Sequence, residues 1–455
     1  MNINDIPAKS NLYFLGIGGV SMSAIALILA RKGYNISGYD RAPSIVTTDL
    51  SDKGITVYFD FSEEQLKNID FIVYSAAFGP DHEIMKLCVK SGKPLISRAE
   101  VLGALAKQYK NSVAVAGTHG KSTTSGMLAH TFINAVGCDP TAVIGATMLD
   151  ASSTFRIGSD DNFIFEACEY KDSFLSFFPR IAVTLNIALD HTDYFHSIEQ
   201  MKDSFVHYMN NAGKDGYAIY NLDDENCVDV AEKVIAHKIT FSAAGNENAD
   251  FYAKNVKNAD GHPTLDVYKR GKFLFTITPG APGNHNVSNS LAAIAVCDIS
   301  GLSEKDTVSG IESFEGVGRR FQHIAKFCGA DVFDDYAHHP DEIKATLSTA
   351  KQMPCKRVIC VFQPHNYSRL LDLYDDFKVS FADADKLILC PLYAAREACG
   401  NEVSSEKLAK EIGAEYYETF DEIKKRLSAI AEEGDLILIM GAGDIYKLAN
   451  SFKQQ

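Results

Sequence analysis

Short apolar runs, glycine turns and helices with one apolar face follow one another along the chain. Residues 12–40 show the pattern first. An apolar run at Leu12–Leu15 leads into glycines, an apolar-striped helix covers Ser21–Lys32, Gly33 stands just past its end, and a second strand reaches Asp40. This order of strand, helix and strand predicts a parallel sheet with helices on both faces.

The same pattern restarts twice farther along the chain. A second set opens with the apolar run at 112–117 and continues with strand-like runs at 162–167 and 180–188. Residues 251–280 alternate strand-like runs with turn residues, which predicts an antiparallel insertion. Residues 312–325 contain two glycines and few apolar positions, and we interpret them as a hinge into the third set.

Three α/β units follow from this pattern, and we place them at residues 1–107, 108–316 and 317–455. The length of 455 residues agrees with about three domains. Apolar residues make up 46% of the chain and charged residues 23%, which is ordinary globular composition.

Charge and composition narrow the classes of partner. The net charge of −15 leaves no broad basic surface, so we expect no nucleic-acid partner. The longest apolar stretches are far shorter than a membrane span and the first residues lack a signal pattern, which predicts a soluble cytoplasmic protein without a membrane partner. Ten cysteines occur without a C-x-x-C pair, which indicates reduced thiols.

The first glycine turn has the spacing Gly16-x-Gly18-x-x-Ser21, with Asp40 at the end of the next strand. A dinucleotide-binding fingerprint would have glycine at the third position. Glycines let a diphosphate approach the backbone at a helix N-terminus, so the motif indicates a diphosphate ligand more than it indicates NAD. A tight turn with a purely structural role remains an alternative.

The stretch Val113–Gly126, VAVAGTHGKSTTSG, is a stronger candidate for a phosphate site. Gly120, Lys121 and Ser122 fit the end of the G-x-x-x-x-G-K-[ST] pattern, but the loop is shorter and begins at Gly117. Successive N–H groups at a helix start attract phosphate oxygens, the lysine can reach the terminal phosphates, and the serine hydroxyl suits Mg²⁺.

Acidic and histidine residues follow two later strands. Glu166 and Glu169 follow the run FIF, and Asp190 and His191 lie just beyond another apolar run. Strand ends of an open parallel sheet face one crevice, so these side chains are candidates for metal binding beside the phosphate loop. An acid after a strand is also commonly a solvated loop residue or a helix cap.

Two further clusters stand out in the last third of the chain. Asn286 and Asn289 lie three apart on one helical face, where either adenine recognition or helix capping would explain them. Strand-end loops carry a second group of acids, histidines and an arginine, which fits recognition and proton transfer better than a zinc site: Asp334, Asp335, His338, His339, His365 and Arg369.

In this order, the stretches GIGGVSMS, AGTHGKSTT, EACEYKDSFL, NIALDH, GNHNVSN, GVGRRF, DDYAHHPDE and FQPHNYSR resemble the motifs of the Mur ligases. The resemblance covers nearly the whole chain. It implies an α/β protein of three domains: a Rossmann-like N-terminal domain for a UDP-sugar, a central P-loop ATPase domain, and a Rossmann-like C-terminal domain for an amino acid. The last two stretches point to the member that joins L-alanine to UDP-N-acetylmuramate in peptidoglycan precursor synthesis.

The resemblance also implies the site residues and the ligands. Contacts to ATP would come from Gly117, Thr118, His119, Gly120, Lys121, Ser122, Thr123, Asn286 and Asn289. One Mg²⁺ would be bound by Ser122 and Glu166, and a second by His191. The UDP-sugar would contact Gly16, Gly18, Gly19 and Ser21. The amino acid would contact His338, His365 and Arg369, while Asn366 stands where some members have a second arginine. The catalytic residues would be Lys121, Arg320 and Asp335.

The implied reaction is ATP-dependent amide-bond formation through an acyl phosphate, because a free carboxylate has no good leaving group. The expected ligands are UDP-N-acetylmuramate, L-alanine, ATP and Mg²⁺, and the expected state is a monomer or a homodimer. Three alternatives stay open: a sister ligase that adds another amino acid or a recycled peptide, a nucleotide-gated switch or binding protein, and an NAD-dependent dehydrogenase.

Overall fold

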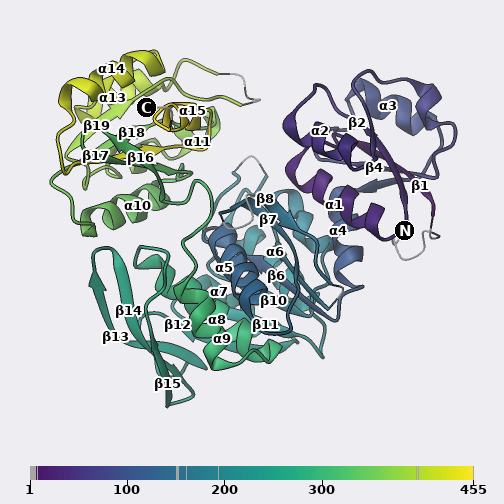
Figure 1. Ribbon diagram of the computed structural model, residues 1–455, viewed down its shortest axis with the longest axis horizontal. Helices are drawn as coiled ribbons and strands as arrows, with labels where there is room; N and C mark the ends of the chain where they lie inside the picture. Colours follow the sequence, from purple (N-terminus) through teal and green to yellow (C-terminus); the bar gives the residue numbers. More distant parts are fainter. Residues whose placement is uncertain are drawn as a thin grey trace. The chain divides into compact units, whose positions relative to one another are not determined.

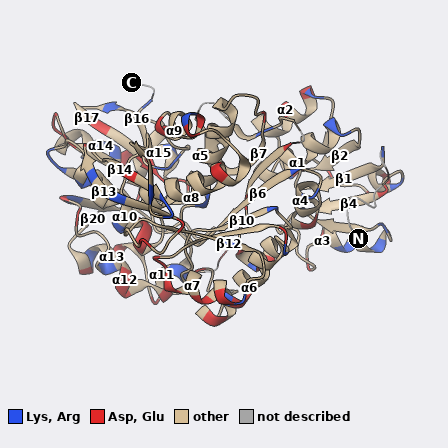
Figure 2. Cartoon of the chain, turned by 90° about the horizontal axis from the view of Figure 1, so that it is seen from below, with Lys and Arg blue, Asp and Glu red and all other residues tan. Residues whose placement is uncertain are grey.

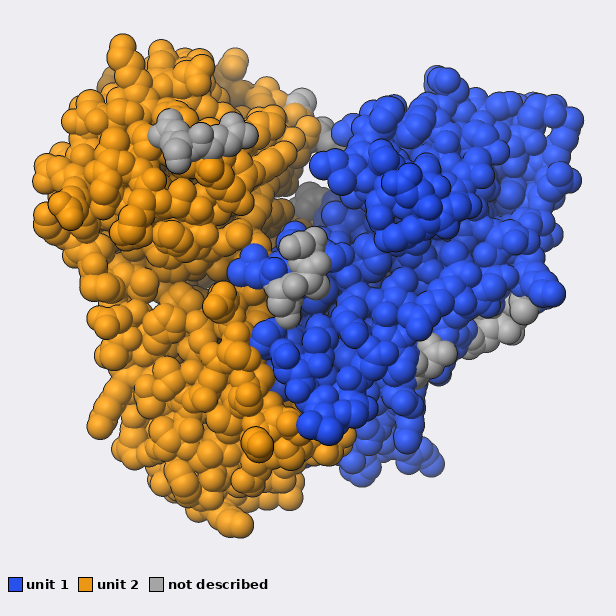
Figure 3. Space-filling model, in the orientation of Figure 1, with its two compact units in different colours: residues 1–187, 201–220, 226–239 blue, residues 188–200, 221–225, 240–455 orange. Residues whose placement is uncertain are grey.

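A computed structural model describes residues 7, 9–149, 153–159, 161–192, 194–395, 397 and 399–453 (Figure 1). The chain forms two compact units (Figure 3). The first comprises residues 1–187, 201–220 and 226–239, and the second comprises 188–200, 221–225 and 240–455. Charged residues lie mainly on helices and loops (Figure 2).

The first unit begins with a five-stranded parallel sheet in the order β3-β2-β1-β4-β5. Its strands are β1 (Asn11–Leu15), β2 (Asn35–Tyr39), β3 (Thr56–Tyr58), β4 (Phe71–Tyr74) and β5 (Leu95–Ser97). Its helices are α1 (Val20–Arg31), α2 (Ile45–Asp52), η2 (Glu63–Leu66), α3 (Glu83–Lys90) and α4 (Arg98–Ala106). The predicted helix after the glycine turn is α1, and Gly33 follows it with φ +90°.

A second set of strands in this unit runs in the order β11-β10-β6-β9-β7-β8. These strands are β6 (Asn111–Ala116), β7 (Thr141–Met148), β8 (Ser153–Arg156), β9 (Asn162–Glu166), β10 (Ile181–Thr184) and β11 (Tyr217–Asn221). The helices are α5 (Lys121–Asn134), η3 (Tyr170–Ser176), α6 (Ile198–Asn210) and α7 (Glu225–Glu232). Strand β10 is shorter than the predicted 180–188, because the backbone after Thr184 turns to meet the loop that follows β6.

The second unit opens with the predicted antiparallel insertion, which is confirmed. Strand β12 (His237–Ser242) pairs in parallel with β13 (Phe251–Ala259), and β14 (His262–Lys269) and β15 (Lys272–Ile277) add antiparallel strands. Helices α8 (His285–Ser300) and α9 (Glu304–Glu312) follow. Gly301 ends α8 in the left-handed conformation, at φ +81°.

A six-stranded sheet in the order β16-β17-β21-β18-β19-β20 completes the second unit. Its strands are β16 (Gln322–Phe327), β17 (Ala330–Asp335), β18 (Val358–Phe362), β19 (Lys386–Leu389), β20 (Glu415–Tyr416) and β21 (Leu436–Met440). The helices are α10 (Pro340–Gln352), α11 (Tyr367–Asp372), α12 (Tyr374–Lys378), α13 (Ser405–Ile412), α14 (Phe420–Ile430) and α15 (Tyr446–Asn450). Interpreting 312–325 as a hinge was wrong at its C-terminal end, where β16 begins at Gln322 and pairs antiparallel with β17.

Alternate residues of β18 face opposite sides of this last sheet. Val358, Cys360 and Phe362 pack with α10, whereas Ile359 and Val361 pack with α14 and α15. Helices therefore cover both faces, as expected of a mostly parallel α/β sheet. Parallel strands alternating with helices confirm the predicted α/β fold class, while the domain boundaries at 107 and 316 stay predictions.

Candidate active site

The loop between β6 and α5 has the conformation of a phosphate cradle. Gly117 has φ +137° and Gly120 has φ +86°, values that side-chain-bearing residues rarely adopt. Gly120 is the N-cap of α5, so Lys121, Ser122 and Thr123 form the first turn of that helix. Their N–H groups have no intrahelical acceptor and can serve phosphate oxygens. The sequence predicted this loop correctly as a strand–turn–helix element.

The ammonium group of Lys121 is folded back over its own loop. Its Nζ lies 2.5 Å from the Gly117 carbonyl oxygen, 3.1 Å from that of Thr118 and 3.1 Å from Glu169 Oε1. Burial alone would lower the pKa of Lys121, but the Glu169 carboxylate, with smaller contributions from Cys168 and Glu166, raises the pKa above its usual value. The lysine is therefore a fixed cation at the mouth of the cradle.

Glu166, the last residue of β9, holds the hydroxyl of Ser122. Ser122 Oγ lies 3.0 Å from both carboxylate oxygens, and the Gly145 N–H donates to Glu166 Oε2 at 2.6 Å. A hydroxyl and a carboxylate side by side at a phosphate cradle are oxygen donors of the kind that Mg²⁺ prefers. The pair predicted from the sequence is thus brought together, and it fits a divalent ion.

Asn186 is a residue that sequence reasoning missed. Its carbonyl oxygen accepts the Thr118 N–H at 3.1 Å, its Oδ1 accepts the His119 N–H at 2.8 Å, and its Nδ2 donates to the His119 carbonyl at 3.1 Å. The N–H groups of Thr118 and His119 are therefore engaged by protein. Phosphate contacts from the loop backbone would come from the residues that follow.

The first glycine turn is closed by its own hydrogen bonds. The N–H groups of Gly16 and Ile17 donate to the Tyr39 carbonyl, and that of Gly18 donates to Asp40 Oδ2 at 2.8 Å. The other Asp40 oxygen accepts the N–H of Arg41. Because this carboxylate is committed to the turn, the arrangement does not favour the dehydrogenase alternative, in which the acid would hold a ribose.

Helix α1 begins directly after that loop, with Gly19 as its N-cap residue and no described side chain capping it. Ser21 lies in the first turn of this helix, and its Oγ accepts a hydrogen bond at 3.0 Å from Nη1 of Arg98, the first residue of α4. Sequence reasoning did not select Arg98, since 77 residues separate it from Ser21.

In the second unit, the asparagine pair of α8 forms one buried group. Asn289 Nδ2 donates to Asn286 Oδ1 at 2.8 Å, and Asn286 Nδ2 donates to the Pro282 carbonyl at 2.7 Å. Asn286 is 3% exposed and Asn289 is 5% exposed. Asn284 is the N-cap residue of α8, so capping does not explain the pair. The Asn289 side-chain amide still has an acceptor and a donor with which it could pair with the edge of an adenine base.

Asp335, one of the predicted catalytic residues, is buried at the end of β17. Its Oδ2 accepts the Phe321 N–H at 2.6 Å, and its Oδ1 accepts the Ala337 N–H at 2.7 Å. Burial raises the pKa of Asp335. These two hydrogen bonds fix the backbone at the end of β17, a structural role for Asp335 that the sequence did not reveal.

Neighbouring charges are paired around that strand end. Arg320 Nη1 lies 3.6 Å from Glu342 Oε1, and Arg319 Nε lies 3.3 Å from Asp334 Oδ2. Burial, together with the nearby Asp335 carboxylate, raises the pKa of Asp334 to about 6 against the opposing effect of Arg319. Arg320, the predicted catalytic arginine, is therefore ion-paired with Glu342 of the same unit in this structure.

The three residues predicted to bind the amino acid lie in one cluster of the second unit. The rings of His338 and His365 have their centroids 5.9 Å apart, and His365 stacks on Tyr393 at 5.7 Å. Arg369 Nη1 donates to the His365 carbonyl at 3.4 Å. Burial lowers the pKa of each histidine to about 4, so both are neutral at pH 7.

Asp190 joins this cluster through an ion pair with Arg369, whose Nη2 lies 3.4 Å from Asp190 Oδ1. Burial opposes ionisation of Asp190, but His191 and Arg369 lower its pKa well below the usual range. His191 has φ +53°, and its N–H donates to Asp190 Oδ1 at 2.7 Å. The predicted metal ligand His191 therefore belongs to the second unit, whereas Ser122 and Glu166 belong to the first.

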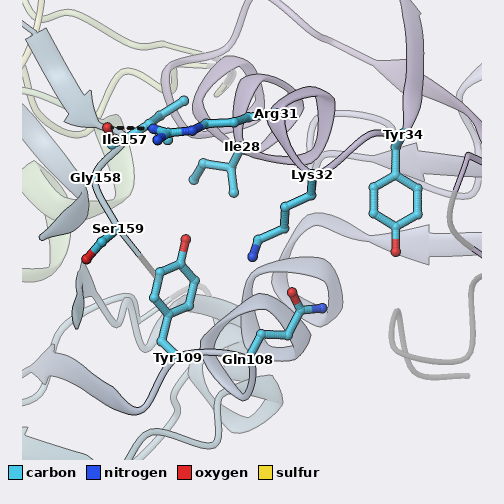
Figure 4. A pocket seen from close by; sticks show the side chains of 9 residues that line it. All are labelled: Ile28, Arg31, Lys32, Tyr34, Gln108, Tyr109, Ile157, Gly158 and Ser159. Atoms are coloured by element: carbon cyan, nitrogen blue, oxygen red, sulfur yellow. Dashed lines mark hydrogen bonds between the residues drawn. The ribbon is translucent and has the colours of Figure 1, made fainter. Parts of the chain in front are cut away.

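A cavity of about 480 Å³ in the first unit lies away from all of these groups (Figure 4). The C-terminal end of α1, the end of α4 and the segment after β8 enclose it. Arg31 crosses one side and donates to the Ile157 carbonyl at 3.1 Å. None of the predicted site residues lines this cavity, so the candidate site is defined by side-chain chemistry and not by this cavity.

Comparisons with known proteins agree along the whole chain. The chain matches the Mur ligase family, catalytic domain, over residues 11–110, the Mur ligase middle domain over 115–297, and the Mur ligase, glutamate ligase domain over 319–443. It is 40% identical to the UDP-N-acetylmuramate–L-alanine ligase of Clostridium novyi (strain NT), over 98% of this chain and 97% of that protein. The chain belongs to the Mur ligase family. The same-named protein of Clostridium acetobutylicum is 41% identical to this Mur ligase, over 99% and 98% of the two chains.

Solved structures agree with this membership. The crystal structure of a UDP-N-acetylmuramate-alanine ligase from Thermotoga maritima superposes with a TM-score of 0.81 at 25% identity, covering 98% of both chains. A murein peptide ligase from Psychrobacter arcticus gives a TM-score of 0.70 at 23% identity and supports the fold alone. No helix in the described part of this Mur ligase is long and apolar enough to cross a membrane.

Proposed function

We propose that this Mur ligase joins L-alanine to the carboxylate of UDP-N-acetylmuramate with ATP, in peptidoglycan precursor synthesis. The observation that carries the proposal is about 40% identity, over nearly the full length, to relatives named for that reaction. The phosphate cradle around Lys121 supplies the ATP-binding element that the reaction needs. A cytoplasmic location and a monomeric or homodimeric state remain predictions.

Activation of the sugar acid is the first step. The carboxylate of UDP-N-acetylmuramate attacks the γ-phosphorus of ATP, the bond to the β-phosphate oxygen breaks, and ADP leaves with that electron pair. Lys121 and Arg320 would offset the negative charge that gathers on the transferred group. Ser122 and Glu166 are the residues that would hold one Mg²⁺, which supplies further charge neutralisation when bound, and His191 would hold a second.

Amide formation is the second step. The neutral amine of L-alanine attacks the acyl carbon, phosphate leaves, and the amine nitrogen gives up a proton. We infer that either Asp335, one of the predicted catalytic residues, or the neighbouring His338 accepts this proton. The ring of His338 is neutral, and its Nδ1 lies 3.0 Å from the Tyr336 carbonyl oxygen. A proton on Nδ1 in that bond leaves the Nε2 lone pair available.

Arg369 would bind the carboxylate of L-alanine. In the structure it shares a charge-assisted contact with Asp190, so the substrate carboxylate would compete with an existing acceptor. Asn366 cannot supply a second cation, and it is held in a left-handed conformation with φ +66°. We therefore expect one arginine, rather than two, to bind the carboxylate.

The test is phosphate release from ATP with a panel of amino acids. The ligase releases phosphate only when UDP-N-acetylmuramate and L-alanine are both present, and mass spectrometry of the product shows the added alanyl group. Release with another amino acid, or with a peptide in its place, identifies a sister ligase. Release without any acceptor identifies a nucleotide-gated protein and contradicts the proposal.

A further inference from the structure

The carboxylate of Glu397 binds the start of the helix that carries Arg369. Glu397 Oε2 accepts the Ser368 N–H at 2.8 Å, and Oε1 accepts the Ser368 hydroxyl at 2.8 Å. Ser368 is the second residue of α11 and directly precedes Arg369. An acid 29 residues farther along the chain thus satisfies two polar groups in the first turn of this helix.

Helix α11 has little support of its own. It contains six residues, and an isolated helix of that length is unstable in water. Its N-cap residue, Asn366, has φ +66°, and the Asn366 side chain makes no cap hydrogen bond in the described chain. The helix therefore lacks the acceptor that an N-cap side chain usually provides, and Glu397 provides one from another segment.

The side-chain contacts of Arg369 are too long to fix its position. Nη1 lies 3.4 Å from the His365 carbonyl oxygen, and Nη2 lies 3.4 Å from Asp190 Oδ1. Ordinary N–H···O hydrogen bonds have donor–acceptor distances of about 2.7–3.2 Å. The location of the Arg369 guanidinium therefore depends mainly on where the backbone of α11 lies.

Glu397 is itself held by a segment that runs beside the residues before α11. The Tyr393 N–H donates to the Pro364 carbonyl at 2.9 Å, and the Tyr393 carbonyl accepts the Asn366 N–H at 3.0 Å. The Glu397 N–H donates to the Ala394 carbonyl at 2.9 Å, which closes a turn. These hydrogen bonds set the register of the two segments, so the Glu397 carboxylate meets α11 at a defined place.

We propose that Glu397 is a positioning residue for recognition of the L-alanine carboxylate: it fixes the first turn of α11 and thereby places the Arg369 guanidinium. This inference rests on the proposed function, in which Arg369 binds that carboxylate. Because Asn366 supplies no second cation, the placement of one arginine decides how well the carboxylate is bound. Glu397 acts through its two hydrogen bonds to Ser368 and not through a contact with the substrate.

The test compares Glu397→Ala, Glu397→Gln and Ser368→Ala with wild type, by phosphate release in the full-length enzyme. Glu397→Ala should raise the KM for L-alanine by about 10- to 100-fold, because a displaced arginine loses a charge-assisted contact with the carboxylate. Turnover at saturating L-alanine, and the KM for ATP and for UDP-N-acetylmuramate, should stay within about threefold of wild type, since only binding of the amino acid is weakened.

The other two variants grade the effect. Glutamine can keep both hydrogen bonds, because its carbonyl oxygen accepts the N–H and its amide group donates to the hydroxyl oxygen. Glu397→Gln should therefore stay within about threefold of the wild-type KM for L-alanine. Ser368→Ala removes the hydroxyl and keeps the backbone N–H, so it should raise this KM by about 3- to 10-fold.

A double-mutant cycle tests whether Glu397 acts through Arg369. The ratio kcat/KM for L-alanine is measured in Arg369→Gln with and without Glu397→Ala. If Glu397 only places the guanidinium, its replacement should change kcat/KM by less than about threefold in the Arg369→Gln background.

Glu422→Ala is the matched control for the loss of a capping carboxylate. Glu422 Oε2 accepts the Thr419 N–H at 3.0 Å and the Thr419 hydroxyl at 2.9 Å, which is the same pair of groups at the start of another helix, α14. This variant should leave the KM for L-alanine unchanged, because α14 carries none of the predicted site residues.

The possible results separate the two hypotheses. If wild type releases no phosphate with L-alanine, the proposed function fails and the inference fails with it. If wild type is active and Glu397→Ala keeps the wild-type KM for L-alanine, only the inference fails. Should Glu397→Ala not fold, an unchanged KM for L-alanine in Ser368→Ala overturns the inference in its place.

Three further results would overturn the inference while the proposed function stands. A rise in KM shared by all three substrates would make Glu397 a general structural residue. Glu397→Gln as impaired as Glu397→Ala would mean that the charge itself is required. A full effect of Glu397→Ala in the Arg369→Gln background would mean that Glu397 does not act through Arg369.

Discussion

Replacing Gly145 with alanine should disconnect Glu166 from the phosphate cradle while leaving the fold intact. Gly145 lies in β7, and a Cβ built on it would be 2.4 Å from Glu166 Oε2 and 2.8 Å from Oε1. Real Cβ contacts are essentially never shorter than 3.0 Å. The carboxylate must therefore move, and it would leave both the Gly145 N–H and the Ser122 hydroxyl.

The size of the effect follows from the contacts that are lost. Hydrogen bonds to a charged group contribute about 1.5–3 kcal/mol each, so displacing the carboxylate from one of them corresponds to about a 10- to 100-fold change. Because the end of a glutamate side chain can rotate away and regain hydrogen bonds from water, the free energy of unfolding should fall by no more than about 3 kcal/mol. The protein should therefore stay folded, so that the effect on turnover can be measured.

The assay is phosphate release in the presence of both acceptors, measured over a series of Mg²⁺ concentrations, with thermal unfolding in parallel. Gly145→Ala should need more Mg²⁺ for half-maximal rate and should turn over about 10- to 100-fold more slowly. Gly79→Ala is the control, because nothing lies within 4 Å of a Cβ at that position. Wild-type turnover and wild-type Mg²⁺ dependence in Gly145→Ala would refute the role given to Glu166.

Three further substitutions test other parts of the structure. Lys121→Ala should lower turnover by more than ~100-fold through loss of the fixed cation, and a loss below tenfold would contradict its assigned role. Gly103→Ala should lower the free energy of unfolding by about 1–3 kcal/mol in chemical denaturation, because an added Cβ would be 1.8 Å from the Ser176 carbonyl oxygen of η3, which is backbone and cannot rotate away; unchanged stability would speak against the α4–η3 packing. Burial lowers the pKa of His338 to about 4, from 6.5 for an unperturbed histidine, so its contribution to stability is present above pH 6.5 and is lost as the pH falls toward 4. His338→Gln should reduce that loss, by up to about 3 kcal/mol between pH 7 and pH 4, and an unchanged pH profile would show that His338 is not held neutral.

Elements set by near neighbours in the chain could be predicted from the sequence. The phosphate loop depends on Gly117 and Gly120 at positive φ directly between a strand and a helix, and all three features are visible in one short stretch. Asn286 and Asn289 lie on the same face of a helix because they are three residues apart, and in the structure a hydrogen bond joins them. Local chemistry of this kind needs no knowledge of the fold.

Contacts that depend on the packing of distant segments could not be predicted in the same way. Arg98 and Ser21 are 77 residues apart, and Glu166 and Gly145 are 21 apart on different strands. Nothing in the local pattern distinguishes Gly145 from an ordinary strand glycine. Strand β16 was missed for a related reason: it lies at a sheet edge, so its residues do not form the continuous apolar run of a central strand.

The contacts of Asn186 show how a shortened loop can still hold its shape. The usual phosphate loop has four residues between its glycines, whereas only Thr118 and His119 separate Gly117 from Gly120 here. A loop with fewer residues has fewer N–H groups of its own to surround a phosphate. The Asn186 side chain and carbonyl bind the backbone of both intervening residues, so the strand end beyond β10 fixes the loop from outside. The rigidity that phosphate binding requires thus comes from a neighbouring strand, and the N–H groups at the start of α5 are left to meet the ligand.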